Sequence, residues 1–251
     1  MTRAESSLLV LLAALAGWTD ALSFTALGKV FTSFQSGNLI FLGLGVDEGD
    51  AQLFVGAGVS LLAFLAGTAL GAYVVRRPEV DASGISSLIP AFVLQLALLV
   101  ALAVCWQVLG EPTGNSASRI LLVALAAAAM GIQGAAVFAL RISGVVTNAM
   151  TATLMLAGIF LGLRARGEAE AQKASQAPMG ILAALCGAYV LSALIVGAID
   201  SPEVTSVGPA ALITLAIAGL LLRDREFQST GSTRRRTLHA HPNLRGGDGS
   251  S

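Results

Sequence analysis

Charged residues are scarce in this chain, and their scarcity excludes an ordinary soluble domain. Asp, Glu, Lys and Arg make up 12% of the 251 residues and apolar residues make up 55%, whereas about a quarter of a soluble domain is charged. The mean hydropathy of +0.78 places the chain in a lipid bilayer. Its formal net charge is zero, so no charge imbalance points to nucleic acid, and no nucleic acid partner is expected.

Histidine and cysteine are also rare, which argues against chemistry embedded in the membrane. Both histidines, His239 and His241, lie in the polar C-terminal tail, so no apolar span offers an imidazole as a base or metal ligand. The sequence has no HExxH motif and no phosphate-binding GxxxxGK loop. Cys105 and Cys186 lie within apolar spans, where a thiol is a small packing group. We therefore expect no enzymatic activity, no cofactor and no metal.

Long apolar segments are what the sequence does contain. A helix needs about 20 apolar residues to cross a bilayer. Two shorter apolar segments, 30–46 and 145–163, follow the long segments 8–27 and 120–140 almost without a loop. The expected fold class is therefore all-α and polytopic transmembrane. The six long segments are 8–27, 53–75, 88–109, 120–140, 179–199 and 207–222.

The two short segments belong to an internal repeat. A shift of 115 positions places Thr32 on Thr147 and Ser36 on Thr151. Both copies carry small and polar residues where an ordinary membrane helix is apolar. Repeats with interrupted helices are typical of transporters, which bind their substrates at the repeat interface. We expect a first membrane repeat over residues 1–115 and a second over residues 116–225. Residues 226–251 are expected to form a disordered cytoplasmic tail.

The number of crossings depends on the two short segments. If both cross, there are eight spans and the repeats are parallel. If both enter and return on the same side, there are six spans, and three crossings per repeat invert the second repeat. Loops rich in Lys and Arg stay cytoplasmic. With the N-terminus inside, and before the tail is counted, the six-span arrangement places nine such residues inside and two outside, whereas eight spans give seven and four.

The charge split favours six spans with two re-entrant segments. The nine inside residues are Arg3, Arg76, Arg77, Arg141, Arg164, Arg166, Lys173, Arg223 and Arg225, and the two outside are Lys29 and Arg119. We therefore expect a multi-pass protein of the inner (plasma) membrane with both termini in the cytoplasm.

The polar residues of the short segments suggest where the helices break. Ser36-Gly37-Asn38 is the expected break in the first copy, because Gly frees the backbone and Asn tolerates left-handed geometry. Thr147, Asn148 and Thr151 are expected to line the second copy, in which Ala152 replaces the glycine. The alternative is an ordinary short helix whose Ser and Thr hydroxyls bond back to their own carbonyls.

Asp20 is the only acidic residue inside an apolar span. A charge there costs about 2.5–3.5 kcal/mol on insertion scales, so the residue faces a cavity, is paired or becomes protonated. One interpretation is a proton, coupling-ion or substrate site. The other is a structural role, with Lys29 as partner if the chain turns back after Gly28. Gln133 occupies the position that Trp18 fills in the first copy and suits either a cavity or a hydrogen bond between helices.

These residues define a candidate site for a substrate or ion where the repeats meet. The expected function is secondary transport or channel-like passage of a small solute. The alternative is a non-transporting membrane scaffold or accessory subunit whose polar residues only pack helices. The expected partners are the lipid bilayer and an unknown small solute, and the oligomeric state is open. The candidate residues are Asp20, Ser36, Asn38, Gln133, Thr147, Asn148 and Thr151.

The same residues resemble the signatures of the YoaK-like family of bacterial membrane proteins. GWTDA at 17–21 and FTSFQSGN at 31–38 match the family patterns G-aromatic-x-D-A and F-x-S-F-x-T-G-N. A second signature, G-x-Q-N-A then T-x-x-x-T-G-T, is matched loosely at 131–135 and 147–153. The resemblance covers about residues 8–222 and implies a polytopic membrane protein of a family viewed as possible small-molecule transporters. The departures are Ser36 for Thr, Gly134 for Asn and Ala152 for Gly.

Overall fold

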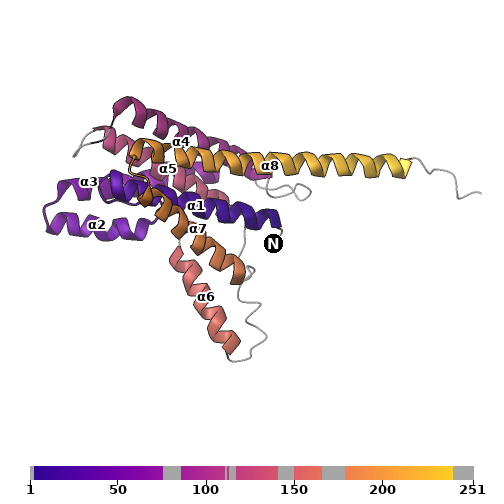
Figure 1. Ribbon diagram of the computed structural model, residues 1–251, viewed down its shortest axis with the longest axis horizontal. Coiled ribbons are helices and arrows are strands. Elements are labelled where there is room, and N and C mark those ends of the chain that lie inside the picture. Colours follow the sequence, from indigo (N-terminus) through magenta and orange to yellow (C-terminus); the bar gives the residue numbers. More distant parts are fainter. Residues whose placement is uncertain are drawn as a thin grey trace, which may run out of the picture.

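The structure is a computed structural model that describes residues 3–75, 86–110, 112, 117–140, 150–165 and 179–239. All regular structure in this part of the chain is helical, which confirms the all-α class. Figure 1 shows a bundle from which α6 is directed away and beyond which the C-terminal part of α8 extends. In chain order, the helices are α1 (Arg3–Ala26), α2 (Gln35–Asp47), α3 (Ala51–Val74), the short 3-10 helix η1 (Ser86–Leu88), α4 (Ile89–Leu109), α5 (Ala117–Ala139), α6 (Met150–Ala165), α7 (Met179–Ala198) and α8 (Pro202–His239).

Six of the described helices are long and apolar enough to cross a membrane, as the sequence predicts. They are α1, α3, α4, α5, α7 and the first part of α8, and each contributes 20 to 24 residues to a candidate span. The last span begins at Pro202 and not near residue 207, so its length is ordinary. By contrast, α2 has 13 residues and α6 has 16, which is too short for a straight crossing of a hydrocarbon core about 30 Å thick.

Two residues, Gly49 and Asp50, encode the turn between α2 and α3. Gly49 adopts a φ of +67°, a left-handed conformation that glycine accepts without steric cost. Asp50 caps α3, because its Oδ1 accepts hydrogen bonds from the backbone N–H groups of Gln52 and Leu53 at 2.9 and 3.0 Å. The tight turn makes α2 and α3 adjacent antiparallel helices (Figure 1).

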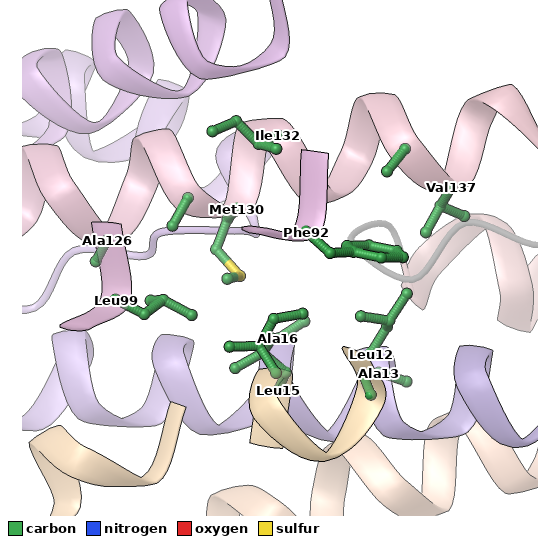
Figure 2. Close-up of a cluster of buried hydrophobic side chains, with 14 of the residues drawn as sticks. Leu12, Ala13, Leu15, Ala16, Phe92, Leu99, Ala126, Met130, Ile132 and Val137 are labelled. Atoms are coloured by element: carbon green, nitrogen blue, oxygen red, sulfur yellow. The ribbon is translucent and has the colours of Figure 1, made fainter. Parts of the chain in front are cut away.

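The core lies where α1, α4 and α5 meet. Figure 2 shows Leu12 and Leu15 of α1 beside Phe92 of α4 and Met130 of α5, and all four side chains are fully buried. Among the described spans, α1 and α5 have the largest buried shares. The outward faces of α3 and α7 are apolar and exposed, as expected for surfaces that contact lipid.

Helices α1 and α5 run antiparallel. Near the start of α1, the Leu12 carbonyl accepts a hydrogen bond from Gln133 Nε2, late in α5, at 3.0 Å. Just beyond the end of α1, the Leu27 carbonyl accepts one from Arg119 Nη1, early in α5, at 3.3 Å. From the first of these hydrogen-bonded pairs to the second, the residue number rises along α1 and falls along α5. Helices α1 and α5 are the first helices of the two expected repeats.

The starts of three of the four helix pairs and the main packing pairs follow the internal repeat. The exception is α3, whose first residue shifts to position 166, whereas α7 begins at residue 179. A shift of 115 carries the first residues of α1, α2 and α4 to positions 118, 150 and 204, and α5, α6 and α8 begin at 117, 150 and 202. Each packing pair has a counterpart when the halves are exchanged. The pair α3–α5 corresponds to α7–α1, the pair α4–α5 to α8–α1, and the pair α2–α3 to α6–α7. Helices α4 and α8 pack on each other. Exchanging the two halves therefore reproduces the pattern of contacts.

The C-terminal helix is longer than the sequence suggests. It continues to His239, past residue 225, where the expected boundary between the second repeat and a disordered tail falls. Residues 226–239 are therefore helical, and residues 240–251 lie outside the described part of the chain.

Candidate functional site

A non-helical segment, residues 27–34, connects α1 to α2. It begins with two residues in the left-handed region, Gly28 at a φ of +89° and Lys29 at +60°. A Cβ on Gly28 would lie 1.9 Å from Nη1 of Arg119, so a larger residue would have to displace the guanidinium that bonds the Leu27 carbonyl. The two left-handed residues turn the chain back along α1, as the sequence-based proposal of a turn after Gly28 requires.

Asp20 holds this segment against α1. Its side chain is 2% exposed. Its carboxylate accepts hydrogen bonds from the backbone N–H groups of Thr32 at 2.8 Å and Ser33 at 2.7 Å, from both of their hydroxyls, and from the hydroxyl of Tyr189 at 2.7 Å. Five donors thus compensate the buried charge. Lys29, the partner considered from the sequence, is not among these donors, and its side chain is exposed.

Asn38 is the second anchor of the segment. It is fully buried, and its side chain pairs with the backbone of Phe31: Oδ1 accepts from the Phe31 N–H at 3.0 Å, and Nδ2 donates to the Phe31 carbonyl at 2.7 Å. Ser60 on α3 donates to the same carbonyl at 2.6 Å, and Gln35 Nε2 donates to the Thr32 carbonyl at 2.8 Å. Side chains therefore satisfy backbone groups that helical hydrogen bonds would otherwise satisfy, as non-helical backbone inside a membrane protein requires.

Gly37 serves close packing and not a helix break. A Cβ at this position would lie 2.8 Å from the ring of Phe31 and 2.9 Å from that of Phe34. The Phe31 ring also stacks on those of Phe24 and Phe41, with centroids 5.2 and 5.8 Å apart. The expected break at Ser36-Gly37-Asn38 is therefore displaced: these residues form the first turn of α2, and the irregular backbone precedes them.

A cavity of about 630 Å³ lies beside the start of α2. Ser36 lies in the first turn of α2 and Thr151 in the first turn of α6, and these two repeat-equivalent residues both line it. The described residues around the cavity include no charged side chain. They are Ser33, Phe34, Gln35, Ser36, Phe64, Thr68, Ala72, Gly134, Ala135, Phe138 and Thr151.

Of the seven residues predicted from the sequence, the structure places Ser36 and Thr151 at the cavity. Asp20 and Asn38 lie behind it, bonded to the segment 27–34. Gln133 is fully buried in the core, where it donates to the Leu12 carbonyl and accepts from Gln95 Nε2 at 2.9 Å. Thr147 and Asn148 lie outside the described residues.

Tyr189 and Ser60 are the partners that the sequence analysis missed. Both are isolated polar residues within long apolar helices, and each lies outside the repeated motifs. The signal that points to them is a hydroxyl within an apolar, membrane-length helix, where it gains from a partner on a neighbouring helix. In the part of the chain that the structure describes, no three His, Cys, Asp or Glu side chains gather closely enough to hold a metal ion.

Arg119 joins the ends of three helices. Its guanidinium is buried, at 1% exposure, and donates to the Leu27 carbonyl just after α1 and to the Gln52 carbonyl in the first turn of α3, at 3.3 and 2.9 Å. The end of α1, the start of α3 and the start of α5 therefore lie at the same end of the bundle. From the sequence alone, Arg119 is expected to be only a loop charge on the outer side.

Comparisons with known proteins agree with a membrane-spanning chain. Residues 8–221 match a family described as Protein of unknown function (DUF1275). The UPF0700 transmembrane protein YoaK of Bacillus subtilis (strain 168) is 28% identical over 151 residues, which are 60% of this chain and 64% of that protein, so the similarity spans less than two thirds of the relative's length. No solved structure matches the chain. The resemblance to YoaK-like proteins is confirmed, and the chain, a multi-pass membrane protein, belongs to the DUF1275 family.

Proposed function

We propose that this protein is a secondary transporter, or a channel-like protein, for a small solute that binds at the interface of its two halves. One observation carries the proposal: Ser36 and Thr151 occupy equivalent positions of the internal repeat and line the same cavity. In transporters built from repeats, broken helices from the two halves meet at the substrate site. A scaffold whose polar residues only pack helices does not need the first turns of α2 and α6, which are equivalent in the repeat, to meet at a cavity.

Three features support an inverted relation between the halves. Helices α1 and α5 are antiparallel, the helix contacts exchange when the halves are exchanged, and each half has three long helices and one short one. An odd number of crossings per half inverts the second half in the membrane. We therefore propose a pseudo-two-fold axis in the membrane plane, about which the halves move to expose the cavity to each side in turn.

The contacts of Arg119 support re-entry of the first short segment. If α2 crossed the membrane, the end of α1 and the start of α3 would lie at opposite ends of the bundle. Arg119 instead reaches both the Leu27 and Gln52 carbonyls. We propose that the segment 27–34 descends along α1 to the level of Asp20 and that α2 returns to the side from which the chain came.

The candidate residues then divide by role. We propose that Ser36 and Thr151 contact the solute, and that Asp20 and Asn38 hold α2 in place from behind. Gln133 keeps α5 in register with α1, because it bonds the Leu12 carbonyl. A role for Thr147 and Asn148 at the cavity stays a prediction from the repeat.

A ligand screen followed by uptake measurements tests the proposal. A metabolite that binds the folded state raises the melting temperature of the purified protein, and its uptake is then measured in proteoliposomes. The double variant Ser36→Ala/Thr151→Ala should lower both the ligand-induced shift and uptake. The matched control is Thr25→Ala/Thr214→Ala, because these hydroxyls are exposed and bond only to their own helices.

Water access provides the decisive counter-test. Single cysteines at 36 and 151, in a background without Cys105 and Cys186, should react with small water-soluble thiol reagents, and a bound ligand should protect them. If neither position reacts from either side and no solute is taken up, the cavity is sealed and the protein does not transport.

A further inference from the structure

We infer that the cavity takes an uncharged solute with a compact apolar body and one hydrogen-bonding end. This deepens the proposed function and rests on it, because it names the chemical class that the same site would carry. The inference comes from how the cavity wall is divided between apolar and hydroxyl-bearing side chains, and from where the nearby carboxylate points.

The apolar part of the wall suits a ring or a branched alkyl group. Three phenyl side chains, those of Phe34, Phe64 and Phe138, come from three different parts of the chain and line the cavity together with Ala72 and Ala135. At about 630 Å³, the cavity falls within the usual range for small-molecule sites, roughly 300–1,000 Å³. A bare inorganic ion would leave most of this wall uncovered.

The polar part of the wall consists of groups that can both donate and accept. No described residue forms a hydrogen bond with the hydroxyl of Ser36 or Thr151, and a hydroxyl can bond a solute hydroxyl, carbonyl or amide. Gln35 also lines the cavity, but its amide is committed to Thr32, Ser60 and Asn38. The available recognition groups are therefore neutral hydroxyls.

The carboxylate of Asp20 is not available to a cationic solute. Ser33 lines the cavity and donates its hydroxyl to Asp20 Oδ2, and Tyr189 donates to the same oxygen. A solute ammonium would have to displace one of these donors or lose its hydration without a counter-charge, which is costly at membrane depth. No cation lines the described wall to attract an anion either. Arg141, three residues beyond Phe138, lies outside the described residues, so an anionic probe belongs in the test.

Four probes that share a phenyl ring separate the possible classes. The melting temperature of the purified protein is measured at pH 7 with equal concentrations of 2-phenylethanol, 2-phenylethylammonium, phenylacetate and ethylbenzene. We expect 2-phenylethanol to raise it by about 2 °C or more and the other three to have much smaller effects. The double variant Ser36→Ala/Thr151→Ala should bind 2-phenylethanol several-fold more weakly.

A pair of tryptophan variants tests whether the cavity is the site. Ala72→Trp fills the cavity from α3 and should abolish the response to 2-phenylethanol. Leu65→Trp, on the same helix but 63% exposed on its lipid-facing side, should retain it. If both variants keep the response, the probe binds elsewhere and the inference is wrong.

The remaining outcomes distinguish this inference from the proposal of transport. A larger shift with the ammonium or with phenylacetate overturns the uncharged class, and so does the absence of any shift. If ethylbenzene matches 2-phenylethanol in the wild type and in the double variant, the cavity holds an apolar chain such as a lipid tail. Binding of 2-phenylethanol without flux into proteoliposomes leaves the inference standing and removes transport. If a charged solute is taken up and its uptake requires Asp20, transport stands and the inference of an uncharged solute is wrong.

Discussion

The hydroxyl of Tyr189, on α7, donates a 2.7 Å hydrogen bond to Oδ2 of Asp20, on α1. The two residues are 169 positions apart and belong to different halves of the repeat. The same oxygen accepts the hydroxyl of Ser33, so one carboxylate joins α1, the segment 27–34 and α7. The position equivalent to Asp20 in the second half is Ala135. The carboxylate that holds the segment before the first short helix therefore has no counterpart at the equivalent position of the second half.

Asp20→Asn should destabilise the protein without removing its ligand response. The amide would present an NH₂ group to donors that now bond a carboxylate oxygen, and loss of such contacts costs about 3 kcal/mol or more at a buried site. Tyr189→Phe removes one of the five donors and should cost less, about 1.5–3 kcal/mol. Both changes should lower the melting temperature of the purified protein.

The ligand response of the same preparations tests the role of Asp20. Since Asp20 does not line the cavity, the folded fraction of Asp20→Asn should still be stabilised by a ligand of the wild-type protein. A variant that melts normally but no longer responds to the ligand would make Asp20 a binding or coupling residue, as the sequence alone also allows.

Gly37→Ala should destabilise the protein by about 1–3 kcal/mol, because the new Cβ would press on the rings of Phe31 and Phe34. The gain in helix propensity, about 1 kcal/mol or less, does not offset this. The second half of the repeat has Ala152 at the equivalent position, together with Val146 and Ala149 in place of the two phenylalanines. The smaller residues there are consistent with the extra methyl group of Ala152.

A double-mutant cycle with Phe31→Val provides the control. If the two side chains conflict directly, the combined variant should be at least about 0.5 kcal/mol more stable than the sum of the single effects predicts. Strictly additive losses would show that Gly37 is required for another reason, such as its backbone conformation.

The membrane fold could be predicted from the sequence because it depends on local patterns. Apolar runs of about 20 residues determine the number of long helices, and the shift of 115 locates the short ones. The sequence predicts the break at Ser36-Gly37-Asn38, later than the non-helical residues 27–34, because a glycine in a polar run suggests backbone freedom. The contacts of Gly37 with Phe31 and Phe34 depend on how the segment folds back, which no local pattern shows.

The partners of the buried polar residues could not be predicted for a related reason. Two of the five donors to Asp20 are backbone N–H groups, which carry no sequence signature, and a third is Tyr189 from α7. Gln133 aligns with the repeat but bonds across to α1 and α4, because neighbouring helices and not the repeat determine its surroundings. Ser36 and Thr151 line the same cavity, and the shift of 115 pairs them in the sequence; their role as site residues stays a prediction.

Gly67→Ala should destabilise the protein more than any other glycine substitution on α3. A Cβ at Gly67 would lie 2.1 Å from the carbonyl oxygen of Ala128 on α5, and backbone atoms cannot yield as a side chain can. Separating α3 from α5 should cost about 3 kcal/mol or more. Gly58→Ala on the same helix is the control, because its nearest contact would be Leu42 Cδ1 at an ordinary 3.6 Å. Equal effects of the two variants would place the α3–α5 interface elsewhere.

Cysteine labelling in intact cells should place residues 48 and 203 on the same, external side of the membrane. In a background without Cys105 and Cys186, an impermeant thiol reagent should label cysteines at Glu48 and Glu203 and should not label one at Arg3. The structure supports this, because Arg119 joins the end of α1 to the start of α3, and Gln107 at the end of α4 bonds the Glu203 carbonyl at 3.1 Å. In the eight-span arrangement α2 crosses fully, so position 48 would be cytoplasmic while position 203 stays external. The contradicting result is that Glu203→Cys is labelled in intact cells, whereas Glu48→Cys reacts only after the cells are permeabilised. Such a result would establish parallel repeats. It would also remove the inverted site on which the proposed transport depends.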